Sequence, residues 1–235
     1  MLDELSFWQG NPFLSPSLTH RLTLLYSFKS ATIVTFNFAY TDQLMAKVTD
    51  TLEMDKIVMI SKNLGTQKHF SLALTQNLNP KPWWSMTFNG LAYFVQNEVS
   101  FDAYRNLDLA QFAGRLNLVQ GFQLPHKLKA ELSATYNSKR LSGANTLSQP
   151  TSQVDIALQK SLLKDKASLR LAVTDIYKGN QSKYTQNFPG FSSSSYGYYE
   201  SQQVRLSFSY KFSSGSSKAQ RNRKSALESE SGRIQ

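Results

Sequence analysis

The sequence predicts an all-β protein, an antiparallel up-and-down transmembrane β-barrel segment of about nine strands. Three observations lead to this prediction. Apolar and polar residues alternate with a period of two along most of the 235 residues, which is the pattern of strands. Helical periodicity is nearly absent. The connections between the alternating segments are short and long in turn, as in membrane barrels with short turns at one end and long loops at the other.

The predicted strands are found in order by their alternation. In the first, Leu22 and Leu24 share one face while Arg21 and Thr23 share the other. The third is an extended run over about 54–78, in which Gly65 indicates a bulge rather than a chain reversal. The remaining strands are predicted at 31–41, 83–95, 110–120, 127–137, 154–162, 167–175 and 203–212.

The predicted connections alternate in length, and the chain as a whole divides into three regions. Short turns are predicted at 29–30, 79–82, 121–125 and 163–165, and long polar loops at 42–53, 98–107, 139–150 and 177–199. Residues 1–16 are predicted to be a loop that enters the first strand, and 17–212 the barrel segment. Residues 213–235 form a basic tail that we expect to be disordered and, in a barrel, periplasmic.

An apolar face opposite a polar face is compatible with two architectures. In a soluble sandwich the apolar face is the core, whereas in a large membrane barrel it meets lipid and the polar face lines the lumen. Long strands and aromatic residues near strand ends favour the barrel. Trp83, Trp84, Tyr93 and Phe94 are predicted to belong to a membrane girdle. The alternative is a soluble or surface-attached β-rich binding protein.

Composition narrows the class of function. The chain has a formal net charge of +10, a pI near 9.7 and no cysteine, which excludes disulfides and thiolate metal sites. No apolar run approaches the ~20 residues of a membrane helix, and the first residues show no signal-peptide pattern. The basic residues are dispersed without an RNA-binding signature, so we expect no nucleic-acid partner.

Several segments resemble TonB-dependent outer-membrane receptors, especially their Bacteroidetes-type outer-membrane β-barrel family. These are "GNPFLSPSLTHRLTLLYSFK" (10–29), "NLGTQKHFSLALTQNLNPKPWWSMTFNG" (63–90) and "LQKSLLKDKASLRLAVTDIYKGN" (158–180), followed by a terminal strand that ends in Phe212. The resemblance implies the bacterial outer membrane and a barrel of about 22 strands with a plugged lumen, which imports a scarce nutrient. Nine strands are too few for that wall, so we interpret the chain as the C-terminal part of such a receptor.

The resemblance also implies partners. They are outer-membrane lipid, the missing N-terminal plug and barrel strands, the barrel assembly machinery and, indirectly, the TonB complex. A last strand that ends in an aromatic residue resembles the signal by which such barrels are recognised for assembly. That predicted assembly row consists of Val204, Leu206, Phe208, Tyr210 and Phe212.

The polar positions and the last loop supply the predicted site residues. The predicted lumen-facing residues are Arg21, Asn37, Asn89, Arg115, Asn117, Lys129, Glu131 and Arg205. In the loop 177–199, aromatic side chains on a Ser/Gly-rich backbone are typical of adaptable recognition. The predicted ligand contacts there are Tyr184, Phe188, Phe191, Tyr196, Tyr198 and Tyr199.

The sequence offers no constellation for catalysis. His20, His69 and His126 fall on separate segments, and glycines are isolated rather than grouped in a phosphate-binding loop. No serine sits in a nucleophile elbow. We therefore expect no enzymatic activity, no metal and no cofactor.

Overall fold

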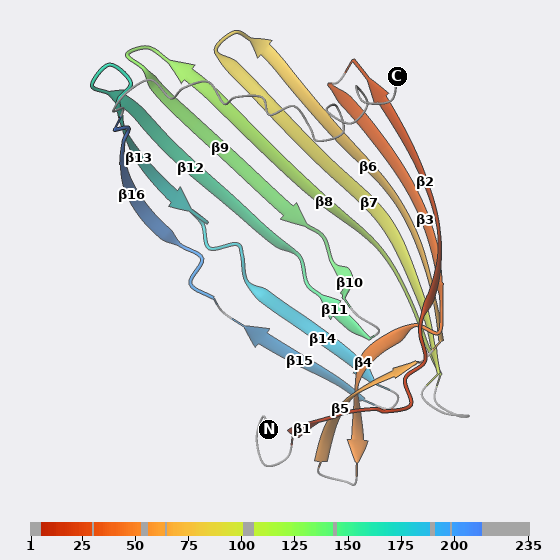
Figure 1. Cartoon of the computed structure of the whole chain (residues 1–235). Coiled ribbons are helices and arrows are strands. Elements are labelled where there is room, and N and C mark those ends of the chain that lie inside the picture. The colour runs from red at the N-terminus through yellow and green to blue at the C-terminus, as the bar shows by residue number, and fades with distance from the viewer. Residues whose placement is uncertain are drawn as a thin grey trace, which may run out of the picture.

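The chain forms one large antiparallel sheet with two small sheets at one end (Figure 1). The computed structural model describes residues 6–29, 31–52, 56–63, 65–100, 106–142, 145–188, 191–197 and 199–212. The large sheet consists, in spatial order, of β2 (Leu18–Phe28), β3 (Thr32–Asp42), β6 (Gly65–Lys81), β7 (Trp84–Ser100), β8 (Asn106–Leu124), β9 (Leu128–Asn137), β12 (Thr151–Leu162), β13 (Ala167–Thr174) and β16 (Gln203–Tyr210). The prediction of an all-β up-and-down segment of about nine strands is confirmed.

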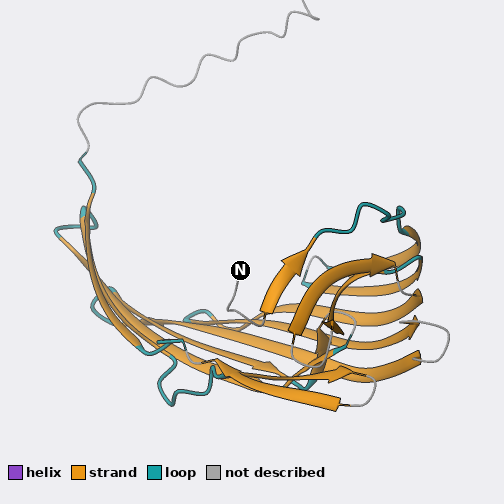
Figure 2. Cartoon of the chain, turned by 90° about the horizontal axis from the view of Figure 1, so that it is seen from below, coloured by secondary structure: helices purple, strands orange, loops and turns teal. Residues whose placement is uncertain are grey.

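The nine-stranded sheet is curved but not closed (Figure 2). Each strand pairs antiparallel with its neighbours, so the chain runs up and down across the sheet in sequence order. Within the described residues, the outer edges of β2 and β16 pair with no strand. In the same part of the chain, no helix is long and apolar enough to cross a membrane.

Short turns gather at one end of the sheet, the upper end in Figure 1. They join β2 to β3, β6 to β7, β8 to β9 and β12 to β13, and they lie close to their predicted positions. The third and fourth turns place non-glycine residues at positive φ, for example His126 at 61° and Lys164 at 55°. Left-handed residues of this kind help to reverse antiparallel strands over the short connections 125–127 and 163–166.

The long-loop end differs from the prediction. It carries a three-stranded sheet of β1 (Ser6–Gln9), β5 (Lys56–Asn63) and β4 (Met45–Leu52), and a four-stranded sheet of β10 (Arg140–Ser142), β11 (Thr146–Ser148), β14 (Ser182–Phe188) and β15 (Phe191–Gly197). All of these strands except β5 fall in residues that were expected to be loops. The loop predictions for 1–16, 42–53, 139–150 and 177–199 were therefore wrong in these strands. The largely polar, Ser-rich sequences of β14 and β15 lack apolar alternation, because a hairpin wetted on both faces needs none.

Two further predicted regions, a loop and the tail, are compared with the structure. The predicted loop 98–107 shrinks, because β7 continues to Ser100 and β8 begins at Asn106. The predicted tail 213–235 lies outside the described residues, as do 101–105.

Gly65 marks the place where the chain changes sheets. The predicted single run over about 54–78 is divided here, because β5 belongs to the three-stranded sheet and β6 to the nine-stranded sheet. The prediction of a bulge at Gly65 within one strand was therefore wrong, and Gly65 lies at a corner between two sheets. Gly65 has a φ of 150° and its carbonyl accepts a hydrogen bond of 2.8 Å from the Leu44 amide. A side chain at this φ is strained, so the corner requires glycine.

Candidate functional site

The register of the nine-stranded sheet sorts its side chains onto two faces. The apolar face is defined by rows such as Phe38–Phe70–Phe94–Phe112, and the polar face by rows such as Thr75–Asn89–Asn117–Thr135. Because partners in a cross-strand row point to the same side, each row fixes the face of its strands.

Large apolar side chains on the apolar face are exposed. Leu72 retains 52 % of its accessible surface, Phe112 66 % and Leu206 67 %, although all three belong to paired strands. No second layer covers this face within the described residues. An apolar surface that spans several strands without a covering layer indicates contact with lipid or with another protein.

The polar face is the more crowded one. Ser71, Val95, Ala113 and Ala157 lie in its rows and are all buried. Side chains converge on the concave side of a curved sheet and spread on the convex side. The difference in burial therefore identifies the polar face as concave and the apolar face as convex.

A hydrogen-bonded ladder crosses four strands on the polar face. The Thr75 hydroxyl donates to the Asn89 side-chain oxygen over 3.0 Å, and the Asn89 amide lies 3.5 Å from the Asn117 oxygen. The Asn117 amide then donates to the Thr135 hydroxyl over 2.9 Å. The ladder satisfies these polar groups side by side and fixes the strand register, because a slip of one residue would send every member to the other face.

The predicted lumen-facing residues all lie on the polar face. This follows from register pairs that connect Arg21, Asn37, Asn89, Arg115, Asn117, Lys129, Glu131 and Arg205 across the sheet. Glu131 accepts an ion-paired hydrogen bond of 3.2 Å from Arg170, and Arg115 borders a polar cavity of about 260 Å³ with Thr135 and Gln153. The contact of these residues with a lumen remains a prediction.

The apolar face ends at a line of phenylalanines. The Phe38 and Phe70 rings are tilted by 36° with centroids 4.8 Å apart, and Phe94 and Phe112 continue their row. Two residues after this row toward the long-loop end, the same face carries Lys68. The Lys68 amine forms an ion pair of 3.3 Å with Glu98, which lies one row further along. The surface therefore changes abruptly from apolar to charged.

The predicted girdle is placed in two parts. Trp83 and Trp84 lie at the β6–β7 turn. Their two rings and the Phe122 ring form a cluster in which each pair of ring centroids is 6.3 Å apart. The expected strand-end position of Tyr93 and Phe94 was wrong, because residues 96–100, which are polar except for Val99, continue β7 by backbone pairing. The two residues also face opposite sides, Tyr93 pairing with Ser71 on the polar face.

Phe94 nevertheless lies ten residues after Trp84 on one strand and on the apolar face. A tilted membrane strand needs about 9–11 residues. The two aromatic rows therefore border a band of membrane width, and the girdle role itself stays a prediction.

The loop aromatics do not form one patch. Tyr184 pairs with Ser195 and Tyr196 with Lys183, so these adjacent register positions place the two tyrosines on opposite faces of the β14–β15 hairpin. Tyr199 lies beyond the hairpin and is 74 % exposed. Phe188 and Phe191 pair with each other at the hairpin tip, and Tyr198 lies outside the described residues.

Two of these tyrosines, Tyr184 and Tyr196, border a cavity. The cavity is shallow, has a volume of about 300 Å³ and is lined by Gln149, Lys183, Tyr184, Thr185, Ser194, Ser195 and Tyr196. The Lys183 amine lies 5.4 Å from the centroid of the Tyr196 ring. The cavity combines an aromatic ring, a cation and hydroxyl groups, which can contact a polar ligand.

A buried carboxylate that the sequence reasoning missed holds the start of β16. Asp175 is fully buried and accepts hydrogen bonds from the Ser201 hydroxyl, the Gly179 amide (2.8 Å) and the Asn180 amide (3.1 Å). Burial by itself raises the pKa of Asp175, but these three hydrogen bonds outweigh it and hold the pKa below its ordinary value. The sequence carries no turn signal for this anchor, because an Asx turn bonds two residues ahead, whereas Asp175 bonds amides four and five residues ahead.

The network continues through the backbone of the same residue. The Asp175 amide donates to Asp155 over 2.8 Å, and the Asp175 carbonyl accepts from the Gln202 side chain over 3.1 Å. Residues before and after the last long connection are thereby tied together. The Asp175 network sets where β16 begins on β13.

The predicted assembly row lies on the apolar face of β16. Val204, Leu206, Phe208 and Tyr210 pair with Val173, Leu171, Leu169 and Ala167. Phe212 follows the strand, is 88 % exposed, and meets Tyr210 edge to face with ring centroids 4.7 Å apart. Its role in assembly remains a prediction.

In the described residues, no group of three His, Cys, Asp or Glu side chains is placed to hold a metal ion.

Comparison with known proteins gives one family. No curated protein and no solved structure matches the chain significantly. A family model, described as the outer membrane protein beta-barrel family, matches residues 1–210. The exposed apolar convex face, the hydrogen-bonded polar concave face and this match agree, and the chain belongs to the outer membrane protein beta-barrel family.

Proposed function

We propose that the chain is the C-terminal wall of a TonB-dependent-receptor-like transporter that imports a scarce nutrient across the bacterial outer membrane. The observation that carries the proposal is the open nine-stranded sheet, whose two edges pair with no strand among the described residues and which has an apolar convex face and a polar concave face. Such a sheet is an arc of a larger wall. Further strands would extend both edges, and a plug would fill the space beside the concave face.

The polar face fits a lumen that is in contact with a plug. Its Asn and Thr ladder presents amides and hydroxyls whose hydrogen bonds are largely satisfied within the sheet. A surface of this kind stays wet and releases a neighbouring domain readily, because few of its polar groups depend on that domain for a partner. A movable plug needs such a surface.

The long-loop end is the proposed extracellular side, and the Tyr196 cavity is the proposed ligand contact. Tyr196 supplies a flat ring, Lys183 a charge, and Thr185 and Ser194 hydroxyls that lie 3.3 Å from each other. The proposed partners are outer-membrane lipid, the barrel assembly machinery and the TonB complex. We propose no enzymatic role.

An uptake assay tests the transport role. Cells that carry the full-length protein are given labelled nutrients of four classes: a siderophore, cobalamin, a glycan and a peptide. We expect accumulation of one class, and loss of that accumulation when the TonB complex is deleted. Accumulation that persists without the TonB complex would overturn the TonB-dependent mechanism.

Two tyrosine variants test the cavity. Tyr196→Ala removes one of the two rings that border it, whereas Tyr199→Ala removes an exposed ring that does not line it. We expect Tyr196→Ala to weaken uptake about tenfold or more, as loss of a stacked ring does, and Tyr199→Ala to leave it unchanged. Equal uptake by both variants would remove the cavity from the proposal.

The alternative, a soluble or surface-attached binding protein, makes a different prediction. A membrane barrel remains with the outer-membrane fraction and migrates differently on gels before and after heating. A chain that is monomeric and soluble without detergent would contradict the barrel assignment.

A further inference from the structure

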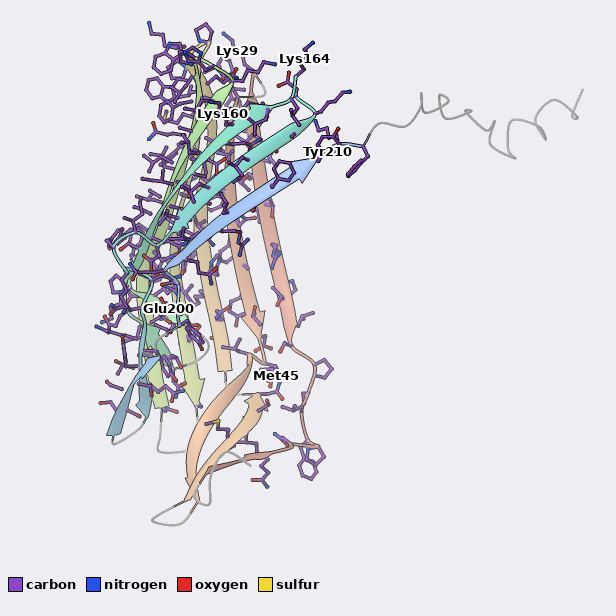
Figure 3. The ribbon with its side chains drawn as sticks, turned by 90° about the vertical axis from the view of Figure 1, so that its left-hand side faces the viewer. Lys29, Met45, Lys160, Lys164, Glu200 and Tyr210 are labelled. Carbon is purple, nitrogen blue, oxygen red and sulfur yellow. The ribbon has the colours of Figure 1, made fainter. Side chains whose placement is uncertain are left out.

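Lysines occupy every short turn of the nine-stranded sheet. The lysine rim, as we name this set, consists of Lys29, Lys81, Lys127, Lys160, Lys164, Lys166 and Lys211. All seven side chains are exposed. They come from five separate places in the sequence, so only the up-and-down topology brings them to one end. Figure 3 shows Lys29, Lys160 and Lys164 at this end, together with Tyr210.

The rim has almost no acidic counterpart. Asp165 is the one carboxylate in these four turns, and Lys127 binds it over 2.6 Å. The hydrogen bond from Lys127 is the main cause that lowers the pKa of Asp165, so it stays ionised at neutral pH. Seven lysines and one aspartate leave a formal charge of +6, more than half of the net +10 of the chain.

The rim borders the apolar face directly. Lys160 lies in a row of that face between Leu128 and Leu169. The amine of Lys29 lies 5.1 Å from the centroid of the Phe28 ring. Lysines at the border of an apolar surface extend their methylene chains along it and place the amine in the headgroup layer.

The opposite border of the apolar face is different. There Lys68 is neutralised by Glu98 over 3.3 Å. At the short-turn end, by contrast, the lysines beside the cluster of Trp83, Trp84 and Phe122 outnumber Asp165, the one carboxylate of the described turns.

We propose that the lysine rim binds the phosphate groups of anionic phospholipids in the leaflet at the short-turn end. Charge complementarity carries this assignment, since an excess of +6 beside a lipid-facing surface selects negative headgroups. The proposal rests on the outer-membrane barrel assignment but not on the transport role. It gives the rim the function of fixing the depth and orientation of the wall.

Tryptophan quenching measures the selectivity. The full-length protein is reconstituted into phosphatidylcholine vesicles that contain brominated phosphatidylglycerol, or brominated phosphatidylcholine for comparison. Trp83 and Trp84 lie within the rim region and report on lipids there. We expect stronger quenching by the brominated phosphatidylglycerol, and a smaller preference at 1 M salt, where the Debye length falls to about 3 Å.

Matched triple variants identify the lysines responsible. The rim variant replaces three rim lysines by glutamine: Lys29, Lys81 and Lys160. The control variant replaces three lysines at the long-loop end by glutamine: Lys68, Lys178 and Lys183. A lysine near an anionic surface changes association by up to about fivefold, so the rim variant should lose most of the preference. The control should keep it, and a rim variant with arginine at the same three positions should restore it.

Three outcomes overturn the proposal: equal quenching by the two lipids in the unaltered protein, an equal loss in both glutamine variants, or no recovery with arginine. The first would assign the rim to an acidic protein surface instead. Heat-modifiable migration verifies that each variant is folded. The quenching experiment measures no uptake, so a negative result in it does not bear on the proposed transport role. Likewise, a negative result in the uptake assay does not prevent the lipid selectivity from being measured.

Discussion

Replacing Asp175 by alanine is expected to lower the free energy of unfolding by about 3–5 kcal/mol. The side chain is fully buried and accepts three hydrogen bonds, from Ser201, Gly179 and Asn180. Hydrogen bonds to a charged group contribute about 1.5–3 kcal/mol each, which sums to about 4.5–9 kcal/mol. Water that enters the cavity left at this exposed end recovers part of the loss.

The loss should concentrate on the last strand. Without Asp175, residues 175–180 are no longer held to the residues that begin β16. Denaturant unfolding of the full-length protein in detergent gives the total change, and hydrogen exchange gives its location. We expect faster exchange in β16 and unchanged exchange in β7, which lies in the middle of the sheet.

Two further variants make the reasoning refutable. Asp175→Asn keeps the volume and one acceptor, so it should cost less than alanine. Asp165→Asn, in an exposed turn, should leave stability nearly unchanged. If Asp175→Ala and Asp165→Asn were equally stable, the buried network would have no energetic role.

The same network predicts a dependence on pH. The pKa of Asp175 in the folded chain is lower than its ordinary value of 3.8, because hydrogen bonds to the carboxylate outweigh burial. A group with a depressed folded pKa stabilises the fold fully above its unfolded pKa, and this contribution is lost as the pH falls through the folded pKa. Stability should therefore fall below about pH 4, and less so in Asp175→Asn, when unfolding is measured across pH 2–6.

Three other changes have defined outcomes. Phe212→Ala should reduce the amount of assembled, heat-modifiable barrel in the membrane, and an unaltered yield would contradict its role in assembly. Asn117→Leu should destabilise the chain by about 1–3 kcal/mol, because Asn89 and Thr135 lose a partner on the polar face; Leu118→Ile, on the other face, is the control for unfolding in detergent. Gly65→Ala should cost about 1–3 kcal/mol, because its φ of 150° strains any side chain, whereas Gly10→Ala, with open space around it, should be neutral in the same assay.

Strand positions were predictable because alternation is a local property. Arg21 and Leu22 differ in polarity because their strand separates two environments, and the pattern repeats along every strand of the large sheet. The hairpins at the long-loop end escaped prediction for the same reason. β14 and β15 are polar on both faces, so their sequence shows no alternation even though their backbones pair fully.

The candidate site was predictable only in part. Polarity alone placed Asn89 and Asn117 on one face, but their hydrogen-bonded ladder depends on register, which the turns and neighbouring strands set. Alternation places Tyr93 opposite Phe94, but only the strand register shows that Tyr93 lies beside Ser71. Grouping Tyr93 with the girdle aromatics followed from its residue type, which suits either surface.

The sequence by itself determined the class of fold, the number of strands in the large sheet and the face to which each alternating residue belongs. The tertiary structure decided which residues meet. Lysines from separate turns form one rim, Asp175 reaches Ser201 across the last long connection, and Tyr184 and Tyr196 lie on opposite faces of one hairpin. The physical reason is that alternation reports only the polarity beside each residue, whereas register and sheet curvature join residues that are far apart in the chain.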